Sequence, residues 1–348
     1  MTSDSKQNRE LIAPAGGGRF VLLDFSRGLA ALSILIFHHY QFKQFSSLYS
    51  SVDFFFVLSG FVLLPSIERV TSYREAASFI KIRAVRLLPM SIATLIFALS
   101  IQKIVEIKHA FYGEQSPEGI PTDPQTLLFA FLLLQVFSQT AQWLNGPLWS
   151  LSVEWLSNII FALLSGAQKM KYVLSIIIAV VLQVHSSFGG EPWELQLGRG
   201  LFAFTIGALT RKYLYRNWEN SHLKSVLSVL IFLGFHLLLV LWSSNLIIVA
   251  PFVFAFLILN AAASVITSSK VLLLSEFLGR YSYGFYAWHF PLLMLVPTII
   301  RRPLSLFPHI QGWTIHIVFL ATIAASLFMT SLIIRFIEPK TRRLFLPR

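Results

Sequence analysis

Apolar runs separated by short polar links extend along almost the whole of this chain of 348 residues. Many of the runs approach the length of about 20 residues that an α-helix needs to cross a bilayer, and no internal repeat or low-complexity tract is evident. The pattern predicts an all-α integral membrane protein without a separate soluble domain. We expect spans at about 20–41, 52–67, 84–104, 172–186, 198–212, 223–242, 246–266, 280–300 and 313–335, with a longer apolar region at 126–166.

The longer apolar region is interrupted by Asn145-Gly146-Pro147, a combination that favours a break in a helix. We therefore place one crossing at about 148–166 and expect 126–143 to be a re-entrant or interfacial piece. Irregular backbone at membrane depth needs protein or a water-filled cavity to satisfy its polar groups. A cavity is accordingly expected near Trp149.

The composition also indicates a protein that is surrounded by lipid. Hydrophobic residues make up 55% of the chain and charged residues only 13%, whereas ordinary globular domains carry about 25% charged residues. The chain contains no cysteine, which excludes a disulfide framework, thiolate metal ligands and a cysteine nucleophile. No bound metal is expected.

The formal net charge is +12, but the basic residues cluster between apolar runs and at the chain ends, as the positive-inside rule describes, and do not indicate nucleic-acid binding. All of these basic clusters lie on the cytoplasmic side of the membrane only if region 126–166 crosses it once. We then expect a bundle of about ten helices with both termini cytoplasmic and the acidic link from Glu106 to Asp123 outside. The expected organisation is a polar cytoplasmic N-terminus at 1–18 without a cleaved signal peptide, a transmembrane domain at 19–338 and a basic cytoplasmic tail at 339–348.

The first expected span carries Asp24, Arg27, His38 and His39. Ionisable side chains inside spans cost at least about 2.5–3.5 kcal/mol each, so they normally face a cavity or pair with one another. Eleven residues separate Arg27 from His38, which places them on one helical face about 16 Å apart. Asp24, three residues before Arg27, is expected to pair with the guanidinium and hold it.

Two further spans begin with polar residues. Arg83 and Arg86 lie three residues apart at the cytoplasmic start of the third span, and paired guanidiniums can bind phosphates, although a positive-inside anchor explains them as well. Asp53 and Ser59 belong to an aromatic second span. The Ser59-Gly60 pair favours close helix packing over a nucleophilic role for the serine.

Glu154 lies one turn inside the expected crossing at 148–166, at the depth expected for His38. A carboxylate beside an imidazole fixes its tautomer and raises its basicity, as a general base requires. We therefore expect Glu154 to orient His38; the alternative is a glutamate that caps donors at the helix start. Trp149 and Ser150, just before it, are expected to line or support the same cavity.

His289 lies seven residues after Ser282, on the same helical face and shortly before Pro291. A histidine of the aromatic belt next to a helix kink would also explain this pattern. We expect His289 to line the cavity.

Together these segments resemble the acyltransferase 3 family of membrane O-acyltransferases, which modify bacterial surface polysaccharides and related glycans. The resemblance runs from about Leu22 to Arg342, and the family's ten-helix domain agrees with the crossing count. The chain departs from the family where Trp155-Leu156-Ser157-Asn158 replaces a second acidic residue and an aromatic run. The matching segments are Arg27 and His38 with ten residues between them, Asp53 to Phe61, Phe79 to Pro89, Trp149 to Glu154, Ser282 to Pro291 and Ile337 to Pro339.

The resemblance implies transfer of an acyl group, most often acetyl, from cytosolic acyl-coenzyme A to a hydroxyl of a surface polysaccharide, glycolipid or related glycan in the bacterial inner membrane. Acyl-coenzyme A would be a co-substrate and no cofactor would stay bound. Arg27, Arg83 and Arg86 would neutralise the phosphates of the coenzyme, and His38 would act as the general base or carry a covalent acyl group. Any second transfer step would need a partner protein.

A proton-coupled secondary transporter or flippase would also use intramembrane Asp, Arg, His and Glu residues. The absence of a detectable inverted repeat speaks against it. The acceptor and the length of the acyl chain are not defined by the sequence.

Overall fold

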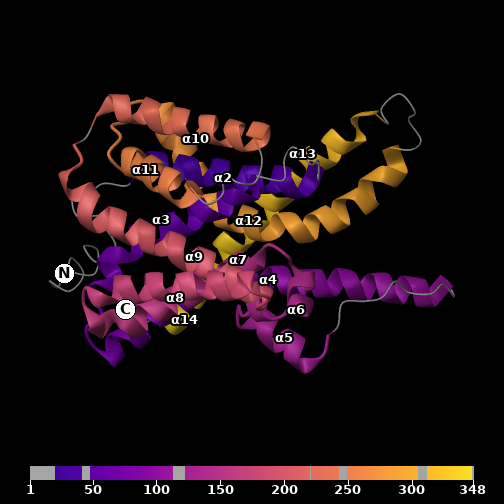
Figure 1. Ribbon diagram of the computed structural model, residues 1–348. Helices are drawn as coiled ribbons and strands as arrows, with labels where there is room; N and C mark the ends of the chain where they lie inside the picture. Colours follow the sequence, from indigo (N-terminus) through magenta and orange to yellow (C-terminus); the bar gives the residue numbers. More distant parts are fainter. Residues whose placement is uncertain are drawn as a thin grey trace.

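The structure is a computed structural model that describes residues 20–40, 48–112, 122–219, 221–242, 249–304 and 312–346. Within these ranges every regular element is a helix and no strand is present, as the sequence predicts (Figure 1). The expected polar N-terminus at 1–18 lies outside the described residues. The α-helices are α2 (Val21–Tyr40), α3 (Ser51–Ile67), α4 (Tyr73–Tyr112), α5 (Pro124–Phe131), α6 (Gln139–Leu144), α7 (Leu148–Leu163), α8 (Met170–Ser187), α9 (Pro192–Leu209), α10 (His222–Trp242), α11 (Ala250–Ala262), α12 (Ser269–Leu304), α13 (Thr314–Leu332) and α14 (Glu338–Phe345).

Short 3-10 or π segments extend or link several of these helices. They are η2 (Gln135–Phe137), η3 (Leu164–Ala167), η4 (Thr210–Leu214), η5 (Tyr215–Asn217) and η8 (Ile333–Ile337).

Seven helical segments of the described residues are long and apolar enough to cross a membrane. Each of the ten expected spans overlaps a helix, but α10 and α11 offer shorter apolar stretches and α9 carries Glu194 and Arg199. The multi-pass helical character is therefore confirmed, while the number of ten crossings and the cytoplasmic termini stay predictions. The seven segments are Val21–Tyr40, Leu48–Ile67, Tyr73–Tyr112, Leu148–Ala167, Met170–Ser187, Ser269–Ile300 and Thr314–Phe345.

The long apolar region at 126–166 is divided, as the Asn145-Gly146-Pro147 sequence predicts. Its first part consists of the short elements α5, η2 and α6, and the long helix α7 begins directly after the break at Leu148. Side chains cap the short helices, since Asp123 accepts a hydrogen bond from the backbone N–H of Thr126 at 3.0 Å and Ser138 accepts one from Ala141 at 3.2 Å. The lower edge of Figure 1 shows α5 and α6 beside α4.

Helices α3 and α9 cross at a point where both lack a side chain. A Cβ atom at Gly60 would lie 1.9 Å from the carbonyl oxygen of Phe204, and one at Gly207 would lie 1.9 Å from that of Val57. Only glycine permits this approach of two backbones. The close packing expected from Ser59-Gly60 is confirmed, and Ser59 lies half-buried beside the crossing.

Helix α12 packs along α2 in the same way. A Cβ atom at Gly28 would lie 2.6 Å from the Cβ of Leu278, and one at Gly279 would lie 2.4 Å from the Cγ of Asp24. This close contact brings the part of α12 that follows Gly279 alongside the polar residues of α2. The site described next is built on this pair of helices together with α4 and α7.

Candidate active site

Charged side chains of three helices form one end of the site. On α2, Arg27 Nη1 lies 3.5 Å from Asp24 Oδ1, so the pairing predicted from their spacing is confirmed. Both side chains are half-buried. Asp24 therefore acts as a local counter-ion that holds the guanidinium in a fixed place.

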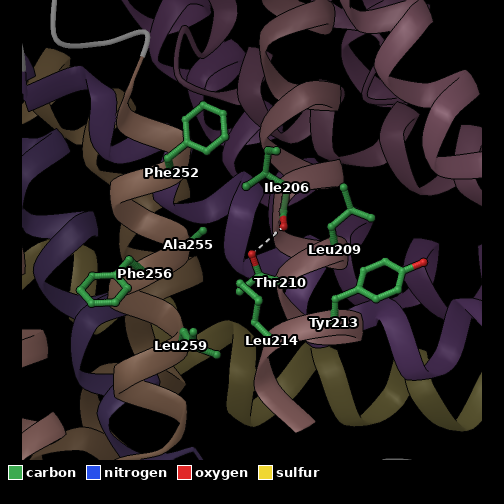
Figure 2. Close-up of a pocket in the computed structure, with 9 residues that line it drawn as sticks. All are labelled: Ile206, Leu209, Thr210, Tyr213, Leu214, Phe252, Ala255, Phe256 and Leu259. Atoms are coloured by element: carbon green, nitrogen blue, oxygen red, sulfur yellow. Dashed lines mark hydrogen bonds between the residues drawn. The ribbon is translucent and has the colours of Figure 1, made fainter. Parts of the chain in front are cut away.

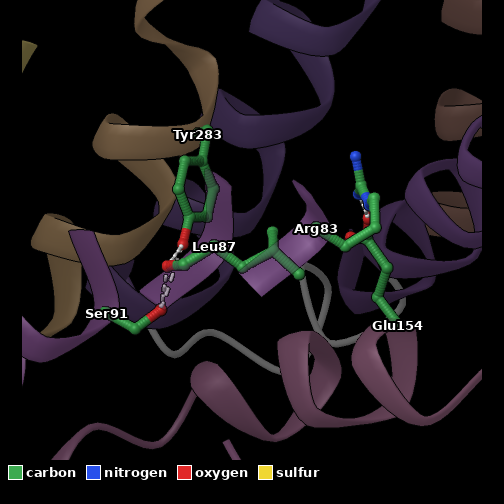
Figure 3. A network of polar contacts seen from close by, with 5 residues as sticks. All are labelled: Arg83, Leu87, Ser91, Glu154 and Tyr283. Carbon is green, nitrogen blue, oxygen red and sulfur yellow. Dashed lines mark hydrogen bonds and ion pairs between the residues drawn. The ribbon is translucent and has the colours of Figure 1, made fainter. Parts of the chain in front are cut away.

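Glu154 of α7 belongs to this charged end and not to His38. Arg83 Nη2 donates a hydrogen bond of 2.8 Å to Glu154 Oε1, and the two side chains are only 7% and 16% exposed (Figure 3). The prediction that Glu154 orients His38 is therefore wrong. The physical reason is that a carboxylate at this depth gains more from a buried guanidinium, which would otherwise lack a counter-charge, than from a neutral imidazole.

Arg86 completes the charged end, one turn beyond Arg83 on α4, where its side chain is exposed. Among these described residues three guanidiniums face two carboxylates, so positive charge remains in excess. Arg83 Nε is buried and has no hydrogen-bond partner in the described part of the chain. We refer to Asp24, Arg27, Arg83, Arg86 and Glu154 as the arginine end.

Tyr283 fixes α12 against α4 beside the arginine end. Its hydroxyl donates a hydrogen bond of 2.6 Å to the carbonyl oxygen of Leu87, the residue after Arg86, and lies 3.0 Å from Ser91 Oγ (Figure 3). His289 lies six residues after Tyr283 on α12, a rise of about 9 Å. Helix α12 thus passes beside the arginine end before it reaches His289.

The other end contains two histidines in direct contact. His289 Nε2 lies 3.2 Å from His38 Nδ1, and His38 Nδ1 also lies 2.9 Å from the carbonyl oxygen of Ile34. His289 is fully buried, with Nδ1 2.5 Å from the carbonyl oxygen of Tyr286. His38 is only half-buried. That His289 lines a cavity stays a prediction, while the structure shows it in contact with His38, the base that the sequence resemblance implies.

Ser150 and Tyr286 join this pair to the start of α7. Ser150 Oγ and Tyr286 Oη lie 2.6 Å apart, and both reach the carbonyl oxygen of Pro147, at 3.0 and 2.9 Å. All three belong to buried residues. We refer to His38, His289, Tyr286 and Ser150 as the histidine end.

Pro291 leaves one carbonyl oxygen of α12 without its usual helical donor. Pro291 has no N–H to donate to the carbonyl oxygen of Ala287 four residues earlier, and Asn145 Nδ2 donates to that oxygen at 3.0 Å instead. The same amide nitrogen lies 3.2 Å from Thr94 Oγ1 of α4. The Asn145-Gly146-Pro147 break thus supports the kinked part of α12 next to His289.

Asp53 is fully buried and pairs with a residue that the sequence analysis did not single out. Arg199 of α9 donates from Nε to Asp53 Oδ1 at 2.8 Å and from Nη2 to Asp53 Oδ2 at 2.6 Å. Its guanidinium lies 4.7 Å from the centre of the Tyr49 ring. An arginine inside an expected apolar span is itself a signal of a buried partner, and that signal could have identified Arg199.

Trp149 lies half-buried with its ring 6.3 Å from that of Phe56. The cavity expected beside it stays a prediction. A separate groove of about 350 Å³ lies between α9, η4 and α11 (Figure 2). It is almost entirely apolar, since the hydroxyl of Thr210 donates to the carbonyl oxygen of Ile206 at 2.8 Å, and neither end of the site contributes to it. In the described residues no three His, Asp or Glu side chains come together as metal ligands would.

Comparison with known proteins identifies one family. A family model described as an acyltransferase domain matches residues 20–335, most of the chain. The matched range contains both ends of the site.

Two curated relatives are similar over long stretches. A protein of Rhizobium radiobacter named "Protein 2 in picA locus" is 33% identical over an alignment of 190 residues that covers 48% of this chain and 94% of that protein. A protein of Bacillus subtilis (strain 168), provisionally named peptidoglycan O-acetyltransferase YrhL, is 26% identical over an alignment of 330 residues that covers 83% of this chain and 51% of that protein. This chain therefore spans about half of the length of the Bacillus relative. No solved structure matches.

Proposed function

Since the chain belongs to the acyltransferase family and is a multi-pass membrane acyltransferase, we propose that it moves an acyl group, most often acetyl, from acyl-coenzyme A to a glycan hydroxyl. The observation that carries this proposal is that α2 and α7 each contribute side chains to both the arginine end and the histidine end, which joins the two ends into one site. Membership of an enzyme family favours transfer over the transport that the polar pattern alone would also permit.

The arginine end fits the phosphates of the coenzyme. Guanidiniums bind phosphate oxygens through paired, charge-assisted hydrogen bonds, and Arg83 still has an unpartnered Nε in the described residues. Glu154 accepts a hydrogen bond from Arg83 Nη2. We assign Glu154 the role of a counter-ion that keeps the buried guanidinium neutralised until phosphate arrives.

The histidine end fits the chemical step. His38 removes the proton from the acceptor hydroxyl while the hydroxyl oxygen attacks the thioester carbon, and the tetrahedral intermediate then expels the coenzyme A thiolate. The imidazolium returns its proton to that thiolate, so the products are the acyl ester and coenzyme A. A covalent acyl-His38 route would instead leave an acyl-imidazole, which hydroxylamine traps as a hydroxamate.

The rise between Arg27 and His38, about 16 Å along α2, agrees with a donor that enters at one membrane face and reacts deeper in the bundle. We propose the orientation with about ten crossings and both termini cytoplasmic, so that the arginine end opens to cytosolic acyl-coenzyme A. The acceptor is then a polysaccharide, glycolipid or related glycan presented from within or beyond the bilayer, in a bacterial inner membrane. The name of the Bacillus relative supports a glycan acceptor.

The test uses the purified protein in lipid nanodiscs with acetyl-coenzyme A carrying a radiolabelled acetyl group and surface glycan from the source strain. We expect label in the glycan that mild alkali releases as acetate, and mass spectrometry of the glycan from a deletion strain to lack the same ester. Unlabelled glycan together with solute accumulation in protein-containing vesicles would reject transfer in favour of transport.

A further inference from the structure

We infer that His289 is a positioning residue that holds His38 as the Nδ1–H tautomer and leaves Nε2 of His38 to act on the acceptor. The inference rests on the proposed function and deepens it, because it says which nitrogen is the base and what holds it. It is carried by the contacts of two imidazoles on two helices that lie far apart in the sequence.

The partner of His289 Nδ1 fixes the tautomer of that ring. A carbonyl oxygen only accepts hydrogen bonds, so the nitrogen 2.5 Å from the carbonyl of Tyr286 must carry the proton. In a neutral imidazole the other nitrogen is then an acceptor. His289 therefore presents a lone pair on Nε2 toward His38.

The two contacts of His38 Nδ1 lead to the complementary assignment. A proton on this nitrogen is shared between the carbonyl oxygen of Ile34 at 2.9 Å and His289 Nε2 at 3.2 Å. If both rings carried the proton on Nε2 instead, each Nδ1 lone pair would face the lone pairs of a carbonyl oxygen. The assignment with both protons on Nδ1 therefore satisfies both carbonyl contacts and the contact between the rings. With Nδ1 protonated, the lone pair of neutral His38 is on Nε2.

Nε2 of His38 remains available for a substrate. It has no hydrogen-bond partner among the described residues, and it is not one of the polar atoms that are buried without a partner. The half-buried His38 thus has Nδ1 bonded within the protein, while Nε2 makes no hydrogen bond to the described residues. The fully buried His289 cannot take this role itself.

Proton transfer strengthens the contact between the two rings. When Nε2 of His38 accepts the proton of the acceptor hydroxyl, the imidazole becomes a cation and its Nδ1–H bond to His289 becomes charge-assisted. An interaction that is stronger in the transition state than in the ground state raises kcat. Return of the proton to the coenzyme A thiolate restores both neutral rings.

Two variants of matched size separate positioning from packing. His289→Gln places an amide oxygen near the present site of Nε2, whereas His289→Leu fills similar volume without an acceptor. We expect His289→Leu to lower kcat about 10- to 100-fold with an unchanged KM for acetyl-coenzyme A, and His289→Gln to retain most of the activity. His39→Leu, next to His38 on α2, is the control and should behave as the wild type.

The outcomes distinguish this inference from the proposed function. If His38→Ala keeps full turnover, the proposed function itself fails. If His38→Ala is inactive while His289→Leu keeps the wild-type kcat, only the positioning role is overturned. Equal losses of kcat in His289→Gln and His289→Leu would also overturn it, because the acceptor would then be irrelevant.

A spectroscopic measurement covers the case in which His289→Leu fails to fold. The chain has nine histidines, so solid-state nitrogen-15 spectra of histidine-labelled wild type and His38→Gln in lipid bilayers are compared to assign the ring of His38. We expect its proton on Nδ1. A proton on Nε2 would overturn the inference without reference to any activity.

Discussion

Glu154 Oε1 lies 2.8 Å from Arg83 Nη2, in a contact that joins α7 to α4 (Figure 3). This ion pair assigns the carboxylate to the arginine end and removes it from the base at the other end of the site. Glu154 thereby satisfies one N–H group of a guanidinium that we propose to bind phosphate. Donor binding and internal charge pairing are therefore linked at this point.

The exposed Arg86 should contribute to donor affinity without contributing much to folding. Arg86→Ala removes a charge-assisted contact to phosphate, which is worth about 1.5–3 kcal/mol, and should raise the KM for acetyl-coenzyme A about 10- to 100-fold. The thermal midpoint in detergent should stay close to that of the wild type. Arg74→Ala, exposed at the start of the same helix, is the control; equal KM values in both variants would show that Arg86 is only a topological anchor.

Glu154→Gln should lower the stability of the protein and increase the stabilisation that coenzyme A provides. The substitution leaves the buried Arg83 charge without a carboxylate, and breaking a buried pair typically costs about 3–5 kcal/mol, somewhat less where glutamine retains a hydrogen bond. The variant should unfold at a lower temperature, and saturating coenzyme A should raise its midpoint by more than it raises that of the wild type. The same ligand-induced shift in both proteins would contradict the counter-ion role of Glu154.

The Asp53–Arg199 pair should be a structural connection between α3 and α9. Either Asp53→Ala or Arg199→Leu leaves one buried charge unpaired and should destabilise the protein by about 3–5 kcal/mol. The double variant should recover a large part of that loss, because no uncompensated charge remains. Thermal unfolding of the wild type, the two single variants and the double variant gives a double-mutant cycle. Purely additive losses of stability would argue against a coupled pair.

The proposed orientation can be tested cleanly because the natural chain has no cysteine. A single Ser116→Cys in the acidic link should react with an impermeant maleimide applied to the outside of intact cells. Ser3→Cys should react only after the membrane is opened, since we place the N-terminus in the cytoplasm. The reverse pattern of labelling would invert the topology and put the arginine end outside.

Local sequence rules predicted the features that depend on neighbours along the chain. The positions of the helices follow from apolar runs of spanning length, the break at Asn145-Gly146-Pro147 from its turn-forming residues, and the Asp24–Arg27 pair from their spacing of three. The close approach at Gly60 follows from the absence of a side chain. The first three depend on geometry within one segment, and the last requires only that one residue lacks a side chain.

Contacts between distant helices were not predictable in the same way. The expected depths placed Glu154 beside His38 and Arg83 at the cytoplasmic start of its span, and only the packing of α7 on α4 brings Glu154 to Arg83. Likewise, 251 positions separate His38 from His289, and nothing in either local segment specifies their contact. Arg199 could have been flagged by its cost in an apolar span, but not its bidentate bond to Asp53.

The most direct test of the account is the turnover of acetyl-coenzyme A by His38→Ala in nanodiscs with glycan acceptor present. Loss of a positioned general base should lower kcat about 10²- to 10⁴-fold, while binding of the donor at the arginine end should remain near that of the wild type. His39→Ala is the matched control on the same helix. A His38→Ala protein that transfers acetyl groups at the wild-type rate would contradict the central claim.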